Sequence, residues 1–337
     1  MERQTLWFQA PYEIVVRAEP LPAVGSAQVL VQTLFSAISA GTELLFYRGQ
    51  APAGMAVDAV LPGLAGQIHY PLQYGYASVG RVIEAGAAVP PGWLGRLVFA
   101  FQPHASHFLA APADLIPLPD DIAPEHAALL PNMETAVNFV MDGAPSIGER
   151  VLVLGQGIVG LLTTALLARM PLACLLTLDR FSPRREASRG LGATAAFDPS
   201  DAAQVQQARD LLGPDDADLT YELSGNPAAV NLAIELTGFA GRIVIGSWYG
   251  QKQAPVNLGG SFHRSRIRLM SSQVSTLAPE RMGRWTKARR MDVAWEMLRR
   301  IPVAPLITHR FCFADAAQAY ALLDQAPEQA LQVILTF

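Results

Sequence analysis

Two different hydrophobic patterns divide the chain of 337 residues. Up to about residue 125, short apolar runs rich in Val, Ile and Phe are bounded by Gly and Pro. This pattern is typical of short β-strands that end at turns. We expect such strands at residues 13–18, 28–38, 78–86 and 96–101. The first part of the chain therefore predicts a compact, mostly β domain.

From about residue 125, apolar strands alternate with helical segments. The expected strands are 150–155, 174–179, 195–199, 218–225, 241–248 and 269–273. The expected helices between them are 157–170, 184–193, 202–213 and 227–237. Alternation at this spacing indicates βαβ units and a parallel sheet. The fold class is therefore α/β, with a doubly wound parallel sheet of the Rossmann type.

The last sixty residues add two helices, 292–300 and 314–325, and a final strand, 330–337. A terminal strand that follows two helices often returns to an earlier sheet. We expect this strand to close the N-terminal β domain, which makes that domain discontinuous. The expected domains are 1–130 with 275–337, and 131–274.

Composition narrows the class of partner. The chain is 51% apolar, with 25 basic and 29 acidic residues, and RWTKARR (284–290) is its one dense basic run. This balance argues against nucleic acid or an anionic membrane surface as the main partner. Residues 151–168 carry no charge over the length of a membrane span. A strand that runs into a buried helix has the same hydropathy, and the glycines in the segment favour that interpretation.

Cysteine usage and the N-terminus indicate a cellular location. The two cysteines, Cys174 and Cys312, are far apart and no CxxC occurs, so neither a cysteine zinc cluster nor a disulfide framework is expected. The N-terminal residues carry early charges and no apolar signal segment. These features agree with a reducing cytoplasm.

A glycine-rich loop follows the strand at 150–155. The sequence VLVLGQGIVG supplies Gly155-x-Gly157-x-x-Gly160. The first glycine permits a tight turn, the second lets the backbone approach a pyrophosphate, and the third lets helix and strand pack closely. The phosphates then lie at the helix N-terminus. The expected cofactor-binding residues of this loop are Gly155, Gln156, Gly157, Ile158, Val159 and Gly160.

Asp179 ends the next strand and bears on the choice of cofactor. It lies near the spacing of ~20 residues at which a carboxylate accepts hydrogen bonds from the adenosine ribose, and it would repel a 2′-phosphate. This favours NAD(H). Arg180, Arg184 and Arg185 follow, and an arginine here stacks on adenine or reaches a 2′-phosphate, so NADP(H) stays open. The remaining alternatives are solvated arginines on a helix and a glycine turn that binds no ligand.

The motifs together resemble a known family. SAGTELLFYRG (39–49) resembles the segment that reads ICGTD…G in zinc alcohol dehydrogenases, and YGYASVGRVIEAG (74–86) resembles their GHE-x-x-G-x-V…G. The chain looks like a medium-chain dehydrogenase/reductase over nearly its whole length. The resemblance implies a GroES-like catalytic domain beside the Rossmann domain. Three motifs, GTE (41–43), GY-x-SVG (75–80) and ITHRF (307–311), are most similar to the branch that contains bacteriochlorophyllide dehydrogenase.

Three departures from the family concern its catalytic zinc. Ala40 stands at the cysteine position and has no ligand atom, Tyr76 stands at the histidine position, and the third position aligns near Pro131. Three such changes leave no tetrahedral site. The four-cysteine structural lobe of the family is missing as well. The resemblance therefore implies a member without zinc.

The six histidines offer little chemistry. His104 and His107 form the one pair with local spacing, and without an acidic neighbour in sequence they are weak metal ligands. We expect them at the surface or in a cleft. His69, His126, His263 and His309 are isolated, and each is expected to be a structural hydrogen-bonding residue, with His309 as a candidate for the cleft.

Hydride transfer is chiefly the chemistry of the cofactor, so protein groups must handle the proton and the developing charge. Thr42 falls on the proton-relay hydroxyl of the family, and its alternative is a turn threonine. Tyr76 is a candidate donor to a developing oxyanion, because an unperturbed phenol keeps its proton at neutral pH; its alternative is an aromatic filler. Glu43 and Glu134 are expected to orient these hydroxyls or to be buried ion-pair residues. Tyr74, Tyr47 and Trp248 are candidates for the substrate cleft, or for the core.

Ser224–Gly225 and Gly246–Ser247 end two expected parallel strands, where ligands bind in open α/β sheets. By resemblance they line the nicotinamide ribose. Three functions stay open: an NAD(P)-dependent alcohol/carbonyl oxidoreductase, a zinc-free enone or quinone reductase, and a dinucleotide-binding protein without turnover. A homodimer paired through 241–250 or the segment after it is expected from the family.

Overall fold

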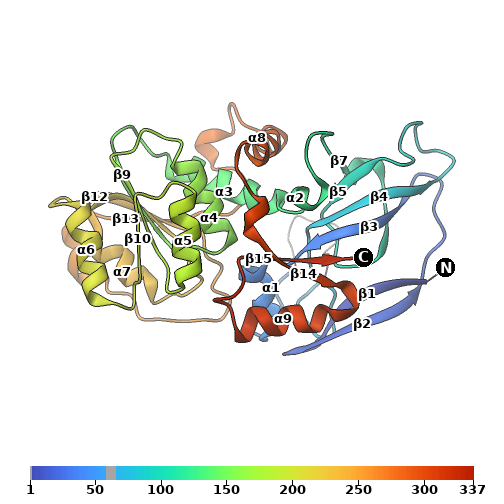
Figure 1. Cartoon of the computed structure of the whole chain (residues 1–337), viewed down its shortest axis with the longest axis horizontal. Coiled ribbons are helices and arrows are strands. Elements are labelled where there is room, and N and C mark those ends of the chain that lie inside the picture. Colours follow the sequence, from blue (N-terminus) through green and yellow to red (C-terminus); the bar gives the residue numbers. More distant parts are fainter. Residues whose placement is uncertain (1, 58–65) are drawn as a thin grey trace. The chain divides into compact units, whose positions relative to one another are not determined.

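The protein is described by a computed structural model that covers residues 2–57 and 66–337. The chain divides into two compact units (Figure 1). Unit 1 contains Met1–Pro131 and Pro302–Phe337, and unit 2 contains Asn132–Ile301. The α/β class, the parallel sheet and the discontinuous, mostly β domain expected from the sequence are confirmed.

Unit 2 is built on a six-stranded sheet with the order β10-β9-β8-β11-β12-β13. Its strands are β8 (Arg150–Leu154), β9 (Cys174–Leu178), β10 (Ala195–Phe197), β11 (Ala217–Glu222), β12 (Thr237–Ile245) and β13 (Arg268–Ser271). All neighbouring strands pair in parallel. The order reverses between β8 and β11, which makes that point the switch point of a doubly wound sheet.

The helices of unit 2 lie before, between and after these strands in the chain. They are α3 (Leu130–Gly143), α4 (Ile158–Leu167), α5 (Ser182–Gly190), α6 (Ala202–Leu212), α7 (Ala229–Glu235) and α8 (Lys287–Arg300). The uncharged segment 151–168 forms β8 and α4, as its glycines indicated. Among the described residues, no helix is long and apolar enough to cross a membrane.

Residues 275–301 belong to unit 2, whereas the sequence analysis assigned them to the β domain. The helix α8 begins at Lys287 rather than 292, because Thr286 caps it by accepting a hydrogen bond from Arg289 N. Arg290 of this helix donates to the side chain of Glu134 in α3 and to the carbonyls of Val274 and Thr276. These contacts attach the segment to unit 2.

Unit 1 contains a seven-stranded sheet and a separate pair of strands. The pair is β1 (Glu2–Ala10) with β2 (Glu13–Pro20). The sheet contains β3 (Val29–Ala37), β4 (Ser78–Ala85), β5 (Leu97–Ala100), β6 (His107–Ala110), β7 (Ile116–Pro117), β14 (Ile307–Cys312) and β15 (Gln332–Thr336). The last strand, β15, pairs antiparallel with β3, so the expected return of the terminal strand is confirmed.

Three helices of unit 1 pack beside these strands: α1 (Ala40–Tyr47), α2 (Pro124–Ala127) and α9 (Ala316–Gln325). Of these three helices, only α9 was expected from the sequence. The strand β1 was not expected either, because ERQTLWFQA begins with charged and polar residues and shows little alternation.

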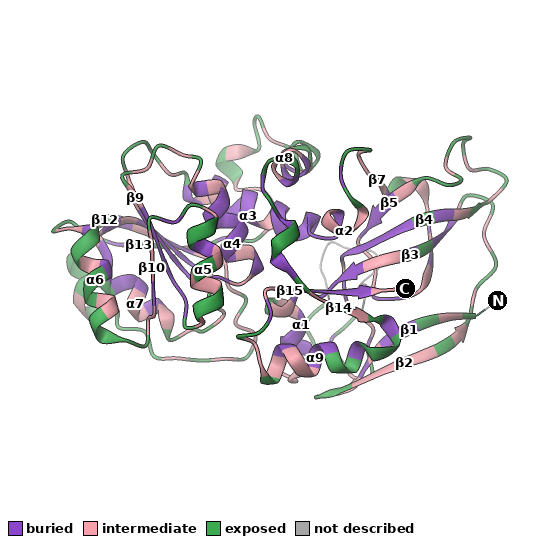
Figure 2. Ribbon diagram, viewed as in Figure 1, coloured by how far each residue is buried: buried purple, intermediate pink, exposed green. Residues whose placement is uncertain are grey.

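Apolar side chains fill each unit separately. Figure 2 shows the strands of the parallel sheet largely buried, with exposed faces on the covering helices. In unit 1 a cluster joins α1, α9 and β1 through Leu6, Phe8, Phe46 and Tyr320. These rigid cores position the loops at the strand ends, where the candidate site residues lie.

Candidate active site

The glycine loop of unit 2 lies at the switch point of the sheet. Gly155 has a φ of 90°, and a Cβ on it would lie 2.5 Å from Ser224 Cα and 2.6 Å from Leu223 O. A Cβ on Gly160 would overlap the carbonyl oxygen of Gly155. Both glycines are therefore required by the packing of the loop against itself and against the end of β11.

Gly157 differs from its two neighbours. Its φ of −66° suits any residue, and a Cβ there would meet no protein atom within 4 Å. Neither strain nor protein packing explains this glycine. A ligand that approaches the backbone closely does explain it, which is the role of the second glycine in a dinucleotide loop. The residues present thus fit a dinucleotide cofactor.

Other residues of the loop hold it in shape. Gln156 is fully buried; its side-chain amide donates to Gly155 O at 3.1 Å, and Thr164 donates to its Oε1 at 3.0 Å. The side chains of Ile158 and Val159 pack into unit 2. These side chains shape the loop from within, so only backbone amides of this segment are left to face a phosphate.

Asp179 is 7% exposed and joins two loops. Its Oδ2 accepts from Gln156 N at 2.7 Å, and its Oδ1 accepts from Phe181 N at 2.9 Å. Each carboxylate oxygen has a further lone pair for a ribose hydroxyl. Asp179 therefore holds the glycine loop in shape, and its role at the ribose stays a prediction.

The arginines after Asp179 fall into two kinds. Arg180 and Arg184 place their guanidinium carbons 5.4 Å and 4.9 Å from the ring centroid of Phe181. Arg185 instead donates to the carbonyls of residues 179 and 180 and pairs with Asp198 at 3.1 Å. Only Arg180 and Arg184 are thus placed as candidates for the adenine end of a cofactor.

The ends of β11 and β12 are joined by hydrogen bonds. Gly225 N donates to Ser247 Oγ at 2.9 Å, so the two expected nicotinamide-side loops do meet. Ser224 donates through its hydroxyl and its amide to Glu222. Gly246 has a packing reason, because a Cβ there would overlap the ring of Phe139.

Sequence reasoning missed the residue that organises this edge. Glu222 is fully buried at the end of β11 and accepts from Ser224 and from the hydroxyl of Tyr249. Burial and the Glu222 carboxylate raise the pKa of Tyr249. Lys252 donates to Gly225 O and adds a positive charge at the same edge. The signal in the sequence that could have identified Glu222 is its place at the end of the expected strand, in YELSG (221–225).

In unit 1, Tyr76 lies just before β4 and donates its hydroxyl hydrogen to Ser39 Oγ. Ser39 directly precedes Ala40 and α1. Thr42 lies in the first turn of α1, where its amide donates to Ser39 O at 3.0 Å, and its side chain is half-buried. The structure thus brings Tyr76 next to the residue that precedes Ala40.

Glu43 is fully buried and sits at the centre of a network within unit 1. Its Oε1 accepts from Ser39 N at 2.6 Å, and its Oε2 lies 2.9 Å from His104 Nε2 and accepts from the hydroxyl of Tyr320. His104 Nδ1 lies 2.6 Å from Ser36 Oγ. Burial and the carboxylate raise the pKa of Tyr320 well above its ordinary value. Glu43 therefore stabilises Ser39 rather than Thr42 or Tyr76 directly.

Glu134 lies in α3 of unit 2 and forms a buried ion pair with Arg290. Its Oε1 accepts from Nη2 at 2.9 Å and from Nε at 3.1 Å. Burial raises the pKa of Glu134, and Arg290 offsets part of that rise. Of the two expected roles, the buried ion pair is the one that this geometry shows, and it joins α3 and α8; a role for Glu134 in catalysis stays a prediction.

Several expected cleft residues lie in the core instead. His104 is fully buried, which corrects its expected place at the surface or in a cleft, while His107 is half-buried at the start of β6. Tyr74 stacks on Phe46 at 4.0 Å and Tyr47 packs on Tyr320 at 5.7 Å. Both tyrosines are core residues. Of the three expected aromatics, Trp248 keeps an exposed side chain.

Zinc does not fit the residues at the family's ligand positions. Ala40 offers no donor atom, and the hydroxyl of Tyr76 is bonded to Ser39. Cys174 lies in β9 of unit 2 and Cys312 is exposed at the end of β14. Over residues 2–57 and 66–337, no three His, Cys, Asp or Glu side chains are grouped to hold a metal ion.

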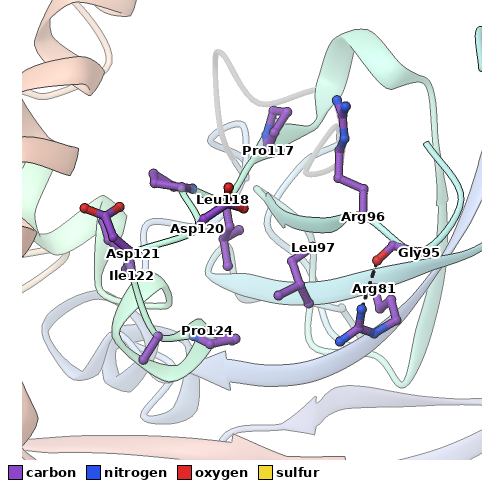
Figure 3. Close-up of a pocket in the computed structure, with 12 residues that line it drawn as sticks. Arg81, Gly95, Arg96, Leu97, Pro117, Leu118, Asp120, Asp121, Ile122 and Pro124 are labelled. Carbon is purple, nitrogen blue, oxygen red and sulfur yellow. Dashed lines mark hydrogen bonds between the residues drawn. The ribbon is translucent and has the colours of Figure 1, made fainter. Parts of the chain in front are cut away.

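A surface hollow of about 690 Å³ lies on unit 1, away from the residues considered so far. Figure 3 shows its wall, where Arg81 donates to Gly95 O and Asp120 and Asp121 lie across from it. The charged side chains that line it are exposed and of both signs. No candidate catalytic residue contributes to this hollow.

Comparison with known proteins gives a family model that matches part of the chain and a relative that matches most of its length. Residues 159–290 match a family model described as zinc-binding dehydrogenase. A D-guloside 3-dehydrogenase of Escherichia coli (strain K12) is 23% identical over 334 residues, which covers 94% of this chain and 94% of that protein.

Two solved structures have the same fold over the whole chain. One is described as a zinc-binding dehydrogenase from Sinorhizobium meliloti 1021 bound to NADP, with a TM-score of 0.80, 20% identity and 100% of both chains covered. The other is described as a short chain alcohol dehydrogenase from E. coli CFT073 complexed with NADH, with a TM-score of 0.80, 19% identity, and 100% of this chain and 99% of that one covered.

Proposed function

We propose that this chain, an oxidoreductase of the zinc-binding, alcohol dehydrogenase-like family, transfers hydride between NAD(P) and an alcohol or carbonyl substrate without a catalytic zinc. The family model and the full-length dehydrogenase relative support the class. The observation that carries the zinc-free part is local. Ala40 has no donor atom, and beside it the hydroxyls of Tyr76 and Ser39 are joined.

The cofactor is a nicotinamide dinucleotide held at the switch point of unit 2. Gly157 leaves the backbone open to a pyrophosphate, and the carboxylate oxygens of Asp179 each keep a lone pair with which to accept from an adenosine ribose hydroxyl. The two solved structures with this fold carry NADP and NADH. The negative charge of Asp179 favours NAD(H). The positive charges of Arg180 and Arg184 accommodate a 2′-phosphate, so NADP(H) stays the alternative cofactor.

The protein groups of unit 1 supply proton handling. A hydroxyl within hydrogen-bond reach can donate to an oxygen that gains negative charge during reduction. Tyr76 is the main candidate, and Thr42 in the first turn of α1 is the second. The substrate is an alcohol, with the bacteriochlorophyllide dehydrogenase-like branch as the narrower proposal, and the enzyme is placed in the cytoplasm.

A homodimer is part of the proposal. Within the described residues β13 is an edge strand of the parallel sheet. Its side chains are mostly exposed, Leu269 to 39%. An exposed strand edge is a ready template for pairing with another chain. Sedimentation of the wild type against a Leu269→Lys variant tests this; a wild-type monomer rejects it.

The test of the main proposal is turnover without metal. The protein is purified in chelator, its zinc content is measured, and absorbance at 340 nm is followed with NAD(H) and NADP(H) against secondary alcohols, polyols, ketones, enones and quinones. We expect turnover of an alcohol/carbonyl pair with less than one zinc per ten chains. Restored activity only on added zinc would reject the zinc-free mechanism.

Matched variants separate the alternatives. Tyr76→Phe should lower kcat by about 10²-fold, the usual contribution of a positioned proton donor, whereas Tyr12→Phe, at a tyrosine that is 58% exposed, should change nothing. Turnover of enones or quinones alone would favour a C=C reductase. Tight NADH binding with no turnover of any substrate would favour a non-catalytic dinucleotide-binding protein.

A further inference from the structure

Ser39 occupies the N-cap of α1 without capping it. Its side chain makes no hydrogen bond to the amides of the first turn, although that is the usual role of serine at this position. The amide of Ser39 instead donates to Glu43 Oε1 at 2.6 Å. The hydroxyl of Ser39 is thereby left for Tyr76.

The direction of the bond between these hydroxyls matters. A phenol has one hydrogen, and that of Tyr76 is directed at Ser39 Oγ. Within residues 2–57 and 66–337, the hydroxyl hydrogen of Ser39 has no acceptor of its own. Because hydrogen bonds in a chain polarise one another, accepting from Tyr76 makes Ser39 the stronger donor to a third oxygen. Ser39 is 8% exposed and Tyr76 is half-buried, so the pair lies at the margin of the core.

The remaining members of the network fix this pair in place. Glu43 holds the backbone of Ser39, and His104 and Tyr320 hold the carboxylate of Glu43. Gly75 precedes Tyr76 with a φ of 110°, and a Cβ on it would lie 2.5 Å from the ring of His104. His104 therefore also limits where Tyr76 can go. Fully buried polar groups restrain one another in this way only when each has its partner.

We propose that Ser39 is a catalytic hydroxyl of this enzyme, that Tyr76 supplies its proton through Ser39, and that Glu43 and His104 are positioning residues. The inference rests on the proposed function and deepens it. The bound cofactor supplies the hydride. As the substrate carbonyl carbon gains its C–H bond, the C=O π pair moves onto oxygen. That oxygen takes the proton from Ser39 Oγ, Ser39 takes the proton of Tyr76, and a solvent proton restores the phenol.

The first test is a double-mutant cycle on turnover. Ser39→Ala and Tyr76→Phe should each lower kcat by about 10²-fold, with KM and NADH affinity unchanged. The double variant should resemble the single ones, because groups that act as one unit are non-additive. Ser39→Thr keeps a hydroxyl and should recover at least tenfold of the loss. Ser106→Ala, a half-buried serine that bonds Gln4 N, is the control. Multiplicative losses in the double variant would reject the relay.

Positioning is tested at Glu43. Glu43→Gln keeps an oxygen that accepts from Ser39 N, whereas Glu43→Leu does not. If Glu43 acts by holding Ser39, the Gln variant retains several-fold more kcat than the Leu variant at equal KM, and Ser39→Ala removes that difference. Equal kcat in the two Glu43 variants would leave Glu43 a purely structural residue.

The second test needs no turnover. Ionisation of Tyr76 is followed by NMR of tyrosine labelled at Cζ, with Tyr76→Phe to assign the signal. The hydroxyl of Ser39 can rotate to donate to the phenolate once Tyr76 has lost its proton, and a hydrogen bond donated to the charged form favours that form. Ser39→Ala should therefore raise the pKa of Tyr76. An unchanged or lowered pKa overturns the inference even if the enzyme is active. A wild type that needs zinc, or turns over nothing, while the pKa rises as expected would instead reject the proposed function alone.

Discussion

Glu43 in unit 1 and Glu134 in unit 2 are both buried glutamates on helices, and the sequence offers both as acids near a reaction centre. Their surroundings differ. Glu43 accepts from an amide and a phenol and lies against an imidazole, whereas Glu134 faces the guanidinium of Arg290. The first arrangement holds Ser39, whose hydroxyl is bonded to that of Tyr76. The second joins two helices, α3 and α8.

The two units differ in the same way. In unit 2 the candidate chemistry rests on the backbone: open space at Gly157, close packing at Gly155 and Gly160, and amides at the start of α4. In unit 1 it rests on side chains brought together from α1, α9 and the segments before β4 and β6. A backbone site tolerates many side chains around it, while a side-chain network depends on every member.

The largest effect is expected at Arg290. Arg290→Met leaves Glu134 buried without its cation, which typically costs about 3–5 kcal/mol. We expect unit 2 to unfold at much lower urea concentration. The double variant Glu134→Leu with Arg290→Met should recover most of the loss, because an apolar pair of similar volume avoids the desolvation cost.

The matched control is Arg289→Met on the same helix, whose guanidinium lies over Trp285 and whose side chain is exposed. Its effect should stay within about 0.5 kcal/mol, as for most surface changes. If Arg290→Met is no worse than this control but abolishes turnover, Glu134 is a functional acid after all, and the contrast between the two glutamates fails.

The next effect separates two glycines of one loop. Gly160→Ala places a Cβ against Gly155 O and should destabilise unit 2 strongly, because a backbone atom must move. Gly157→Ala meets no protein atom and should leave the melting temperature unchanged, yet weaken NADH binding by tenfold or more, measured by nicotinamide fluorescence. Unchanged NADH affinity in Gly157→Ala would mean that the pyrophosphate does not bind at this loop.

A smaller effect is expected on cofactor choice. Asp179→Asn keeps one oxygen for the backbone amides but removes the negative charge. The ratio of NADPH to NADH affinity should rise about tenfold, which corresponds to about 1.4 kcal/mol. Fluorescence titration with both cofactors measures it. A constant ratio would mean that Asp179 only folds the loop and that Arg180 and Arg184 decide the preference.

More of unit 2 than of unit 1 could be predicted from the sequence, and the reason is physical. The loop Gly155–Gly160 and the strand end at Asp179 are local patterns, and a βαβ unit fixes where they meet. Glu43 instead meets His104 from 61 residues away and Tyr320 from 277 residues away. Nothing in the spacing of single residues records such contacts, so His104 was expected at the surface or in a cleft, and Tyr320 was not considered.

The same limit explains the other errors. The helix α1 was missed because AGTELLFY lies among short strands and is apolar on most sides. The assignment of 275–301 to the β domain failed because one side chain, that of Arg290, ties the segment to α3. In the second case a long-range contact overrode the local pattern, whereas the alternation of strands and helices was predicted correctly because it is repeated many times.

The smallest effect concerns His104 and His107, three residues apart and in different settings. Burial lowers the pKa of His107, so the unfolded chain binds a proton more readily than the folded one. Its contribution to stability is therefore present above the unfolded pKa of about 6.5 and is lost as the pH falls through the lower folded value. The urea midpoint of the wild type should fall slightly below pH 6.5, and His107→Asn should reduce that fall. An identical pH dependence in both proteins would mean that His107 is as accessible to protons when folded as when unfolded, and would leave the buried His104 network as the distinctive histidine environment of unit 1.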